Sequence, residues 1–167
     1  LFEALSKLKK NAKLFLKKGS YTFKGKVILP FSDFSIIGLG AVELNGDFAV
    51  NGSNIKIQNI SQKTGNFVLD KHSQNISFEN CRFNDRELTI VNSKNISFTN
   101  CLFRGCYIEE AKKISFGHCS FLSPKYGLDA ALSLNRSEEF EIIDSLIYSE
   151  TFAILLKCDK KDFSKKR

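Results

Sequence analysis

Residues 75–81 read Asn-Ile-Ser-Phe-Glu-Asn-Cys, and residues 95–101 repeat them as Asn-Ile-Ser-Phe-Thr-Asn-Cys. Two related copies flank this pair, at residues 54–60 and 113–119, so that successive copies start 21, 20 and 18 residues apart. Apolar and polar residues alternate within each copy, which is typical of a β-strand with one buried face. Repetition at this period predicts a solenoid, in which each strand buries its apolar face against stacked copies of itself.

The same pattern extends in both directions along the chain. Related segments at residues 13–19, 33–39 and 139–145 bring the number of expected coils to about seven. Each coil has a second apolar position, occupied by Phe83, Phe103, Phe121 and Ile147 in the later coils. A third short apolar stretch follows in every coil, starting at residues 22, 42, 67, 88, 107, 132 and 154. Three strands per coil predict an all-β parallel β-helix over residues 13–156.

Several columns of identical residue types are expected along the helix axis. One turn of successive coils carries Asn59, Asn80, Asn100, His118 and Asp144, and another carries Asn54, Asn75 and Asn95. Asn tolerates left-handed turns, and stacked amides can form hydrogen-bonded ladders, so these columns are interpreted as structural. Cys81, Cys101 and Cys119 form a third column, predicted to be buried and reduced because parallel side chains do not readily reach disulfide torsions. The sequence has no Cys-x-x-Cys pair or His at ligand spacing, so no metal is expected.

Charge is concentrated at the two ends of the chain. Residues 1–26 carry a net charge of +7, residues 27–156 carry −4, and the tail 157–167 carries +4. A nucleic-acid reader would show a basic stripe along the fold with exposed aromatics, so no specific nucleic acid is expected. Phe2, Leu5 and Leu8 recur at helical spacing, which predicts an N-terminal helix within residues 1–12 that caps the first coil. No apolar run approaches the roughly 20 residues of a membrane span, so no transmembrane segment is expected.

Residues 2–5, 17–21, 28–30, 34–38 and 52–55 resemble the start of proteins of the pectate-lyase-like superfamily. Residues 75–121 resemble the generic β-helix repeat of that superfamily, which includes the NosD-like periplasmic proteins. The resemblance implies a right-handed parallel β-helix and a periplasmic or cell-surface location, although reduced cysteines leave the cytoplasm open. It does not fix the activity, since the superfamily holds lyases, glycoside hydrolases, esterases, binding proteins and structural modules.

Enzymatic chemistry on this fold needs carboxylates brought together from neighbouring coils. The best acidic neighbourhood contains Glu87, Glu109 and Glu110, with Arg104 as the basic group. These four residues are the catalytic candidates, and calcium is expected only if the chain is a polysaccharide lyase. By contrast, one outward column is small and neutral, and it gives the candidate binding residues Ser77, Ser97 and Ser115.

Three hypotheses on function follow from these observations. The first is a non-catalytic binding or scaffold domain of a larger protein, with a protein or a polysaccharide as partner. The second is a carbohydrate-active enzyme or its degenerate remnant. The third is a polyanion or membrane tether that acts through the basic ends. If it is not a tether, the tail 157–167 is expected to be a solvated end of the chain. Phe152, Ile154 and Leu156 run directly into that tail, which predicts further coils or a partner over the C-terminal end.

Overall fold

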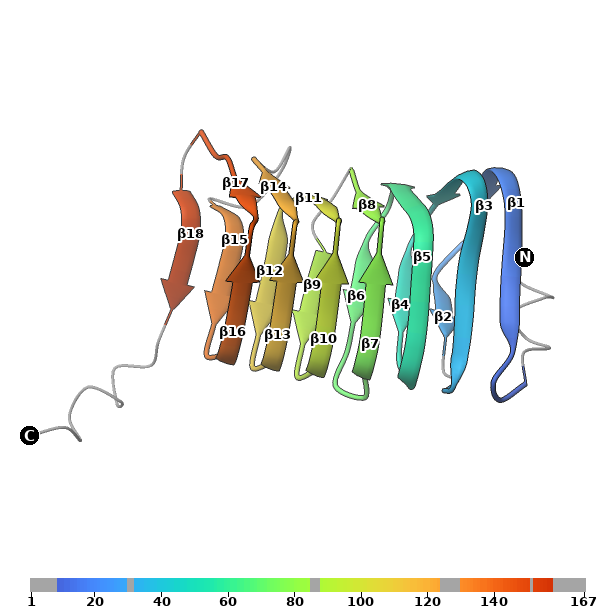
Figure 1. Cartoon of the computed structure of the whole chain (residues 1–167), viewed down its shortest axis with the longest axis horizontal. Coiled ribbons are helices and arrows are strands. Elements are labelled where there is room, and N and C mark those ends of the chain that lie inside the picture. The colour runs from blue at the N-terminus through green and yellow to red at the C-terminus, as the bar shows by residue number, and fades with distance from the viewer. Residues whose placement is uncertain (1–8, 30–31, 85–87, 124–129, 151, 158–167) are drawn as a thin grey trace, which may run out of the picture.

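The computed structural model describes residues 9–29, 32–84, 88–123, 130–150 and 152–157. It is an all-β parallel solenoid of about six turns, with 71% of the described residues in strands (Figure 1). Every strand pairs in parallel with the equivalent strand of the neighbouring coil. The fold predicted from the repeats is therefore confirmed.

Two sheets run along the solenoid, and each coil contributes to both. The first sheet contains one long column of strands and a shorter second column that is joined to it through β5. The long column consists of β1 (Lys13–Thr22), β3 (Phe34–Asn45), β5 (Ser53–Thr64), β7 (Gln74–Glu79), β10 (Lys94–Thr99), β13 (Lys112–Gly117) and β16 (Glu138–Ile143). The second column consists of β8 (Arg82–Phe83), β11 (Leu102–Arg104), β14 (Ser120–Leu122) and β17 (Leu146–Ile147). The other sheet consists of β2 (Val27–Leu29), β4 (Phe48–Val50), β6 (Phe67–Leu69), β9 (Leu88–Val91), β12 (Cys106–Glu109), β15 (Ala130–Asn135) and β18 (Phe152–Lys157).

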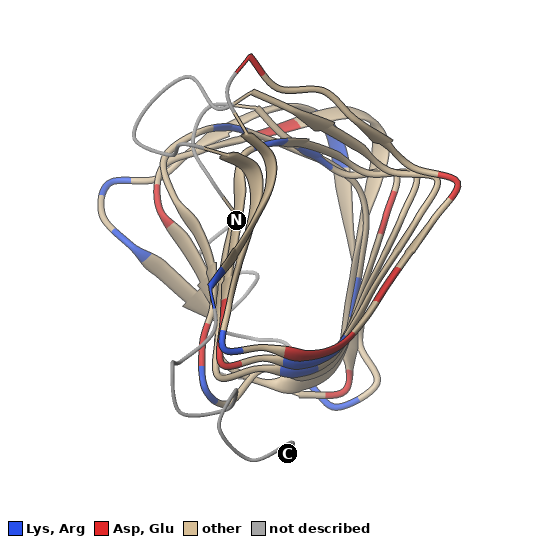
Figure 2. Ribbon diagram, turned by 90° about the vertical axis from the view of Figure 1, so that its left-hand side faces the viewer, with Lys and Arg blue, Asp and Glu red and all other residues tan. Residues whose placement is uncertain are grey.

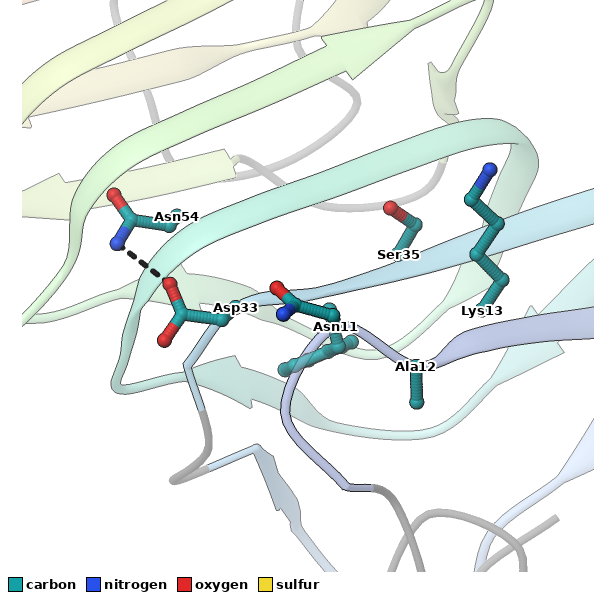
Figure 3. A pocket seen from close by; sticks show the side chains of 7 residues that line it. Asn11, Ala12, Lys13, Asp33, Ser35 and Asn54 are labelled. Atoms are coloured by element: carbon teal, nitrogen blue, oxygen red, sulfur yellow. Dashed lines mark hydrogen bonds between the residues drawn. The ribbon is translucent and has the colours of Figure 1, made fainter.

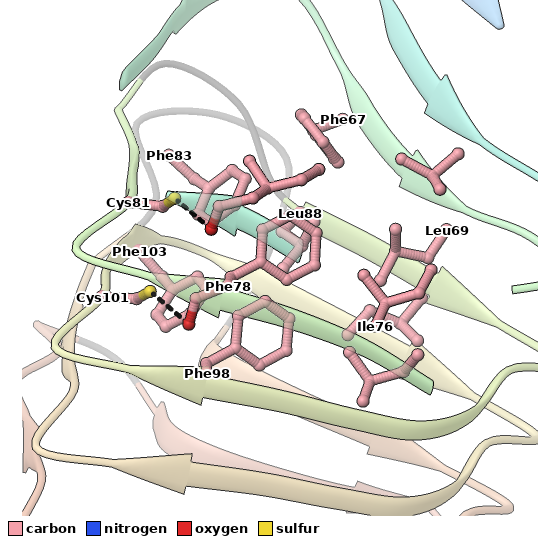
Figure 4. Close-up of a cluster of buried hydrophobic side chains, with 14 of the residues drawn as sticks. Phe67, Leu69, Ile76, Phe78, Cys81, Phe83, Leu88, Phe98, Cys101 and Phe103 are labelled. Atoms are coloured by element: carbon pink, nitrogen blue, oxygen red, sulfur yellow. Dashed lines mark hydrogen bonds between the residues drawn. The ribbon is translucent and has the colours of Figure 1, made fainter. Parts of the chain in front are cut away.

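The interior is filled by columns of identical side chains. The rings of Phe78, Phe98 and Phe116 stack with centroids 4.9 and 5.0 Å apart, and Phe83, Phe103 and Phe121 form a second stack beside them (Figure 4). The two stacks meet edge to face, which is a favourable aromatic arrangement. No Lys, Arg, Asp or Glu among the described residues is buried, and these residues are spread around the ribbon of the coils (Figure 2).

The asparagine columns do turn the chain, as the sequence predicts. Asn59, Asn80, Asn100, His118 and Asp144 all have φ between 47° and 57°, in the left-handed region. Asn54, Asn75 and Asn95 have φ between 53° and 56°, and their amides form a ladder with N–O distances of 2.9 and 3.0 Å. Left-handed backbone disfavours most side chains but is tolerated by Asn, so the residue type is explained by the turn.

The cysteine column is also as expected. Cys81, Cys101 and Cys119 are buried and unpaired, and each thiol contacts backbone carbonyl oxygens, for Cys101 those of Thr99 and Phe78 at 3.4 and 3.7 Å. Hydrogen bonding with Cys101 and burial raise the pKa of the Cys119 thiol. This thiol is therefore a packing group rather than a nucleophile.

Three details differ from the sequence-based expectation. The solenoid makes about six turns rather than seven coils, because the seven expected starts mark strand layers and only six intervals separate them. The third apolar stretch was expected at residues 22 and 42 in the first two coils, but these residues continue β1 and β3. In these coils β2 and β4 instead supply the strands of the sheet that runs from β2 to β18. The long strands β1 and β3 bend around a corner of the coil, with register shifts near Gly19 and Val42.

The N-terminal capping helix is not supported by the described residues. Residues 1–8 lie outside the described part, and residues 9–12 form a turn instead of a helix. Asn11 has φ of 62°, and its backbone N–H donates to the carbonyl of Asp33. Left-handed backbone at Asn11 is incompatible with an α-helix through this position. Of the expected tail, only Lys157 is described, and it ends β18.

The two ends of the described solenoid differ in exposure. The core-facing side chains of the first coil are buried, with Leu16, Val27 and Leu29 at most 5% exposed. In the last coil, Ile154 and Leu156 are paired with the buried Leu132 and Leu134, yet they are 41% and 66% exposed. The partner or further coils expected over this end remain a prediction.

Candidate functional site

The three candidate serines form a straight column on the outside of the first sheet. Ser77 of β7, Ser97 of β10 and Ser115 of β13 are successive Cα partners, and each side chain is half-buried. They face outward because the flanking Ile and Phe of each strand fill the core. Lys56 precedes the column and Glu141 follows it.

An open hollow of about 450 Å³ lies against the last two serines. Its walls combine Ser97 and Ser115 with Asn95, Ile96, Ile114, Lys113, Glu139 and Glu141. Lys112 donates to Glu139 at 3.0 Å and to Glu138 at 3.1 Å, and these hydrogen bonds raise the pKa of Lys112. The hydrogen bond from Lys112 in turn lowers the pKa of Glu139. The lining of the hollow thus combines the neutral hydroxyl groups of Ser97 and Ser115 with charged side chains, of which Glu139 is ion-paired with Lys112.

A second group of polar side chains lies two residues further along β5 and β7, at the next outward-facing position. Gln58 donates to Glu79 at 2.6 Å, and Lys56 forms an ion pair with the same carboxylate at 3.2 Å. The hydrogen bond from Lys56, followed by that from Gln58, lowers the pKa of Glu79. Glu79 is therefore ionised, and its negative charge is balanced by Lys56. A general acid must instead hold a proton that it can donate, so Glu79 does not suit this role.

The structure places two of the catalytic candidates in an ion-paired turn. Arg136 donates to Glu109 and to Glu110, with both N–O distances 2.9 Å. Asn135 adds a hydrogen bond of 2.8 Å to Glu109. Arg136 was missed in the sequence, although alignment of the third turn places it in one left-handed column with Asn92 and Glu110.

The other two candidates do not complete this group. Arg104 ends β11, where it pairs with Leu122, whereas Glu109 ends β12. The two strands belong to different sheets and are separated by a turn at Gly105, where φ is 88°. Glu87 lies outside the described residues. The described residues therefore bring Glu109 and Glu110 together with Arg136, and not with Arg104.

The pairing with Arg136 has a consequence for the titration of Glu109. The hydrogen bond from Arg136 is the main reason that the pKa of the Glu109 carboxyl lies below its ordinary value. We expect Arg136→Gln to move the titration midpoint of Glu109, followed by NMR of the carboxyl carbon, upward toward the ordinary value of a glutamate side chain. Because the pKa is depressed in the folded state, stabilisation by this pair is present above the unfolded pKa and is lost as pH falls through the folded value.

Arg104→Gln is the matched control for this titration. It removes the same charged group from the end of β11, which does not contact Glu109, so the Glu109 midpoint should stay where it is in the unmodified protein. An equal shift in both variants would indicate a general change of net charge rather than the contact with Arg136.

A smaller depression lies at the N-terminal end of the same sheet. It encloses about 310 Å³ and is lined by residues of the first three coils, including Lys13, Ser35 and Asn54 (Figure 3). Asn54 donates to Asp33 at 2.8 Å, and Lys10 lies 3.6 Å from the same carboxylate. Asp33 is therefore already engaged by its neighbours.

Two further features are absent from the described ranges, a group of metal ligands and a membrane-spanning helix. No group of three or more His, Cys, Asp or Glu residues is placed to hold a metal ion there. Among the same residues, no helix has the length and apolar character to cross a membrane.

Comparison with known proteins adds no family assignment. No protein-family model matches the chain, and no curated protein matches its sequence.

Proposed function

We propose that this chain is a non-catalytic β-solenoid module that binds a polysaccharide on the outer face of β10 and β13. The observation that carries the proposal is the register of Ser97 with Ser115 beside the open hollow. A hydroxyl group both donates and accepts hydrogen bonds, as sugar hydroxyls do. Parallel strands repeat these groups about every 4.8 Å, which offers a polymer several equivalent contacts.

The shape of the hollow supports a polymer rather than a small molecule. Small-molecule sites usually enclose most of their ligand, whereas this hollow is open along the sheet. Lys113 and Glu141 at its rim supply a donor and an acceptor that would orient the chain. The resemblance to the pectate-lyase-like superfamily also favours a carbohydrate ligand and a periplasmic or cell-surface setting.

The placement of the acidic residues favours binding over catalysis. Glu109 and Glu110 share Arg136, and Glu139 is paired with Lys112, so these carboxylates are ionised and neutralised by neighbours. A glycosidase needs one carboxyl with a raised pKa to protonate the leaving group. By contrast, the pKa values of Glu79, Glu109 and Glu139 are all lowered by hydrogen bonds from their neighbours.

The test is retention of the chain on immobilised acidic and neutral polysaccharides, with and without calcium, while released oligosaccharide is measured. We expect retention on at least one polysaccharide without release of product. The double variant Ser97→Arg, Ser115→Arg places two long charged side chains over the hollow and should lower retention on a neutral polysaccharide at least about tenfold.

Ser120→Arg is the control, because Ser120 is an outward serine of β14 and its column already contains Arg82. It should bind as the unmodified chain does. Release of oligosaccharide would replace the proposal with a carbohydrate-active enzyme. Absence of both retention and release would leave a protein-interaction scaffold as the better interpretation.

A further inference from the structure

The first two coils carry an outward patch in which lysines surround large apolar side chains. Along β1, Lys13, Phe15 and Lys17 alternate with Leu14 and Leu16, which turn toward the core. Phe15 and Leu39 are each 52% exposed, and Leu39 is the Cα partner of Lys17. We call the exposed residues Lys13, Phe15, Lys17, Lys18 and Leu39 the lysine–phenylalanine patch.

The charge around this patch is of one sign. Residues 9–29 contain seven lysines and no acidic residue, and all seven lysines are exposed. The nearest acidic groups along the sheet are already engaged, Asp33 with Lys10 at 3.6 Å and Glu43 with Lys63 at 3.1 Å. Lys13, Lys17 and Lys18 form no ion pair with other residues of the described part. Their charges are therefore available to an external anion.

The apolar members of the patch distinguish between two kinds of anionic partner. A soluble polyanion gains from lysines alone, and exposed Phe and Leu add little to it. A bilayer surface gains from both, because cationic side chains meet anionic headgroups while aromatic and aliphatic side chains enter the interface. Ile37, the Cα partner of Phe15, extends the apolar part into the second coil.

We propose that the lysine–phenylalanine patch binds the surface of an anionic lipid bilayer. The contact is peripheral: Phe15 and Leu39 reach the headgroup boundary, and the three lysines of the patch pair with lipid phosphates or carboxylates. The strands hold these side chains in place before binding, so little order has to be gained on contact. The patch contains none of the serines of the proposed polysaccharide site, and the two proposals stand independently.

Cosedimentation of the full chain with vesicles tests this proposal. We expect binding to vesicles of phosphatidylcholine mixed with phosphatidylserine, no binding to phosphatidylcholine alone, and weaker binding as salt rises. The triple variant Lys13→Gln, Lys17→Gln, Lys18→Gln should lose about fivefold in affinity for each lysine. Phe15→Ser with Leu39→Ser keeps every charge and should still lose about tenfold.

The control changes equally exposed apolar residues at the other end of the solenoid. Leu146 and Tyr148 are 63% and 58% exposed, and Leu146→Ser with Tyr148→Ser should leave vesicle binding unchanged. Circular dichroism of each variant verifies that the solenoid is intact. Failure to bind phosphatidylserine vesicles overturns the proposal. A second outcome also overturns it. If the Phe15, Leu39 variant binds vesicles as well as the unmodified chain does, and soluble dextran sulfate abolishes this binding, then the partner is a soluble polyanion.

Discussion

Replacing Phe98 with alanine should lower the free energy of unfolding by about 3–5 kcal/mol. Phe98 is 1% exposed and lies in the middle of the interior, stacked between Phe78 and Phe116 and edge-on to Phe103 at 5.2 Å (Figure 4). Removing its ring takes contacts from four aromatic neighbours, since Phe83 also lies edge-on to it at 6.4 Å, and the sheets hold all four in place. The resulting cavity cannot close without shifting a whole coil, so relaxation of the structure should recover little of this loss.

Urea unfolding followed by circular dichroism measures this effect, and Phe15→Ala is the control. Phe15 belongs to the same strand column but faces outward and is 52% exposed, so its removal should change stability by no more than about 0.5 kcal/mol. Equal losses in the two variants would contradict a core built around the Phe98 stack. A lower slope of the unfolding transition in Phe98→Ala would instead show that the coils no longer unfold together.

Gly65→Ala is expected to have a comparable effect for a different reason. Gly65 has φ of 84°, and a Cβ at this position would lie 2.3 Å from the carbonyl carbon and 2.4 Å from the carbonyl oxygen of Gly46. Both atoms belong to the backbone of the preceding coil and cannot turn aside as a side chain can. Left-handed strain and the clash together should cost about 3 kcal/mol or more.

Gly117→Ala is the matched control for this substitution. Gly117 lies in β13, it lacks the left-handed conformation, and a Cβ there would meet no atom within 4 Å. Its replacement should leave the urea midpoint almost unchanged. If Gly65→Ala were equally harmless, the two coils could not lie as close together at this corner as the structure places them.

The repeats were sufficient to predict the fold because each inward position is chemically determined. Ile96 and Phe98 are apolar for the same reason as Ile76 and Phe78, so alignment of one coil with the next is alignment of the interior. The corners were less predictable. Consecutive exposed residues interrupt the alternation of burial in both long strands, at residues 17–18 of β1 and 39–41 of β3, and a window of sequence cannot tell such a bent strand from two separate strands.

The candidate site was harder to predict than the fold for a similar reason. The serine column follows directly from the register, since Ser77, Ser97 and Ser115 occupy equivalent positions. The partner of Glu109 depends instead on which residue occupies the left-handed turn after β15, and this residue type is not repeated, since the equivalent positions hold Asn92 and Glu110. Arg136 is therefore visible only once the third turn of each coil has been aligned.

The left-handed turns shared by successive coils also determine how this molecule can change its length. Asn54, Asn75 and Asn95 are the second residues of equivalent strands, and each amide donates to a side chain of the coil before it. Loss of a single residue within a strand would turn its core side chains toward water. Duplication of one entire coil would instead preserve every contact on both sides and move the two ends apart by about 4.8 Å. The axial length of the solenoid can therefore change only in steps of one coil, and duplication of a coil in the gene would set the distance between its two ends.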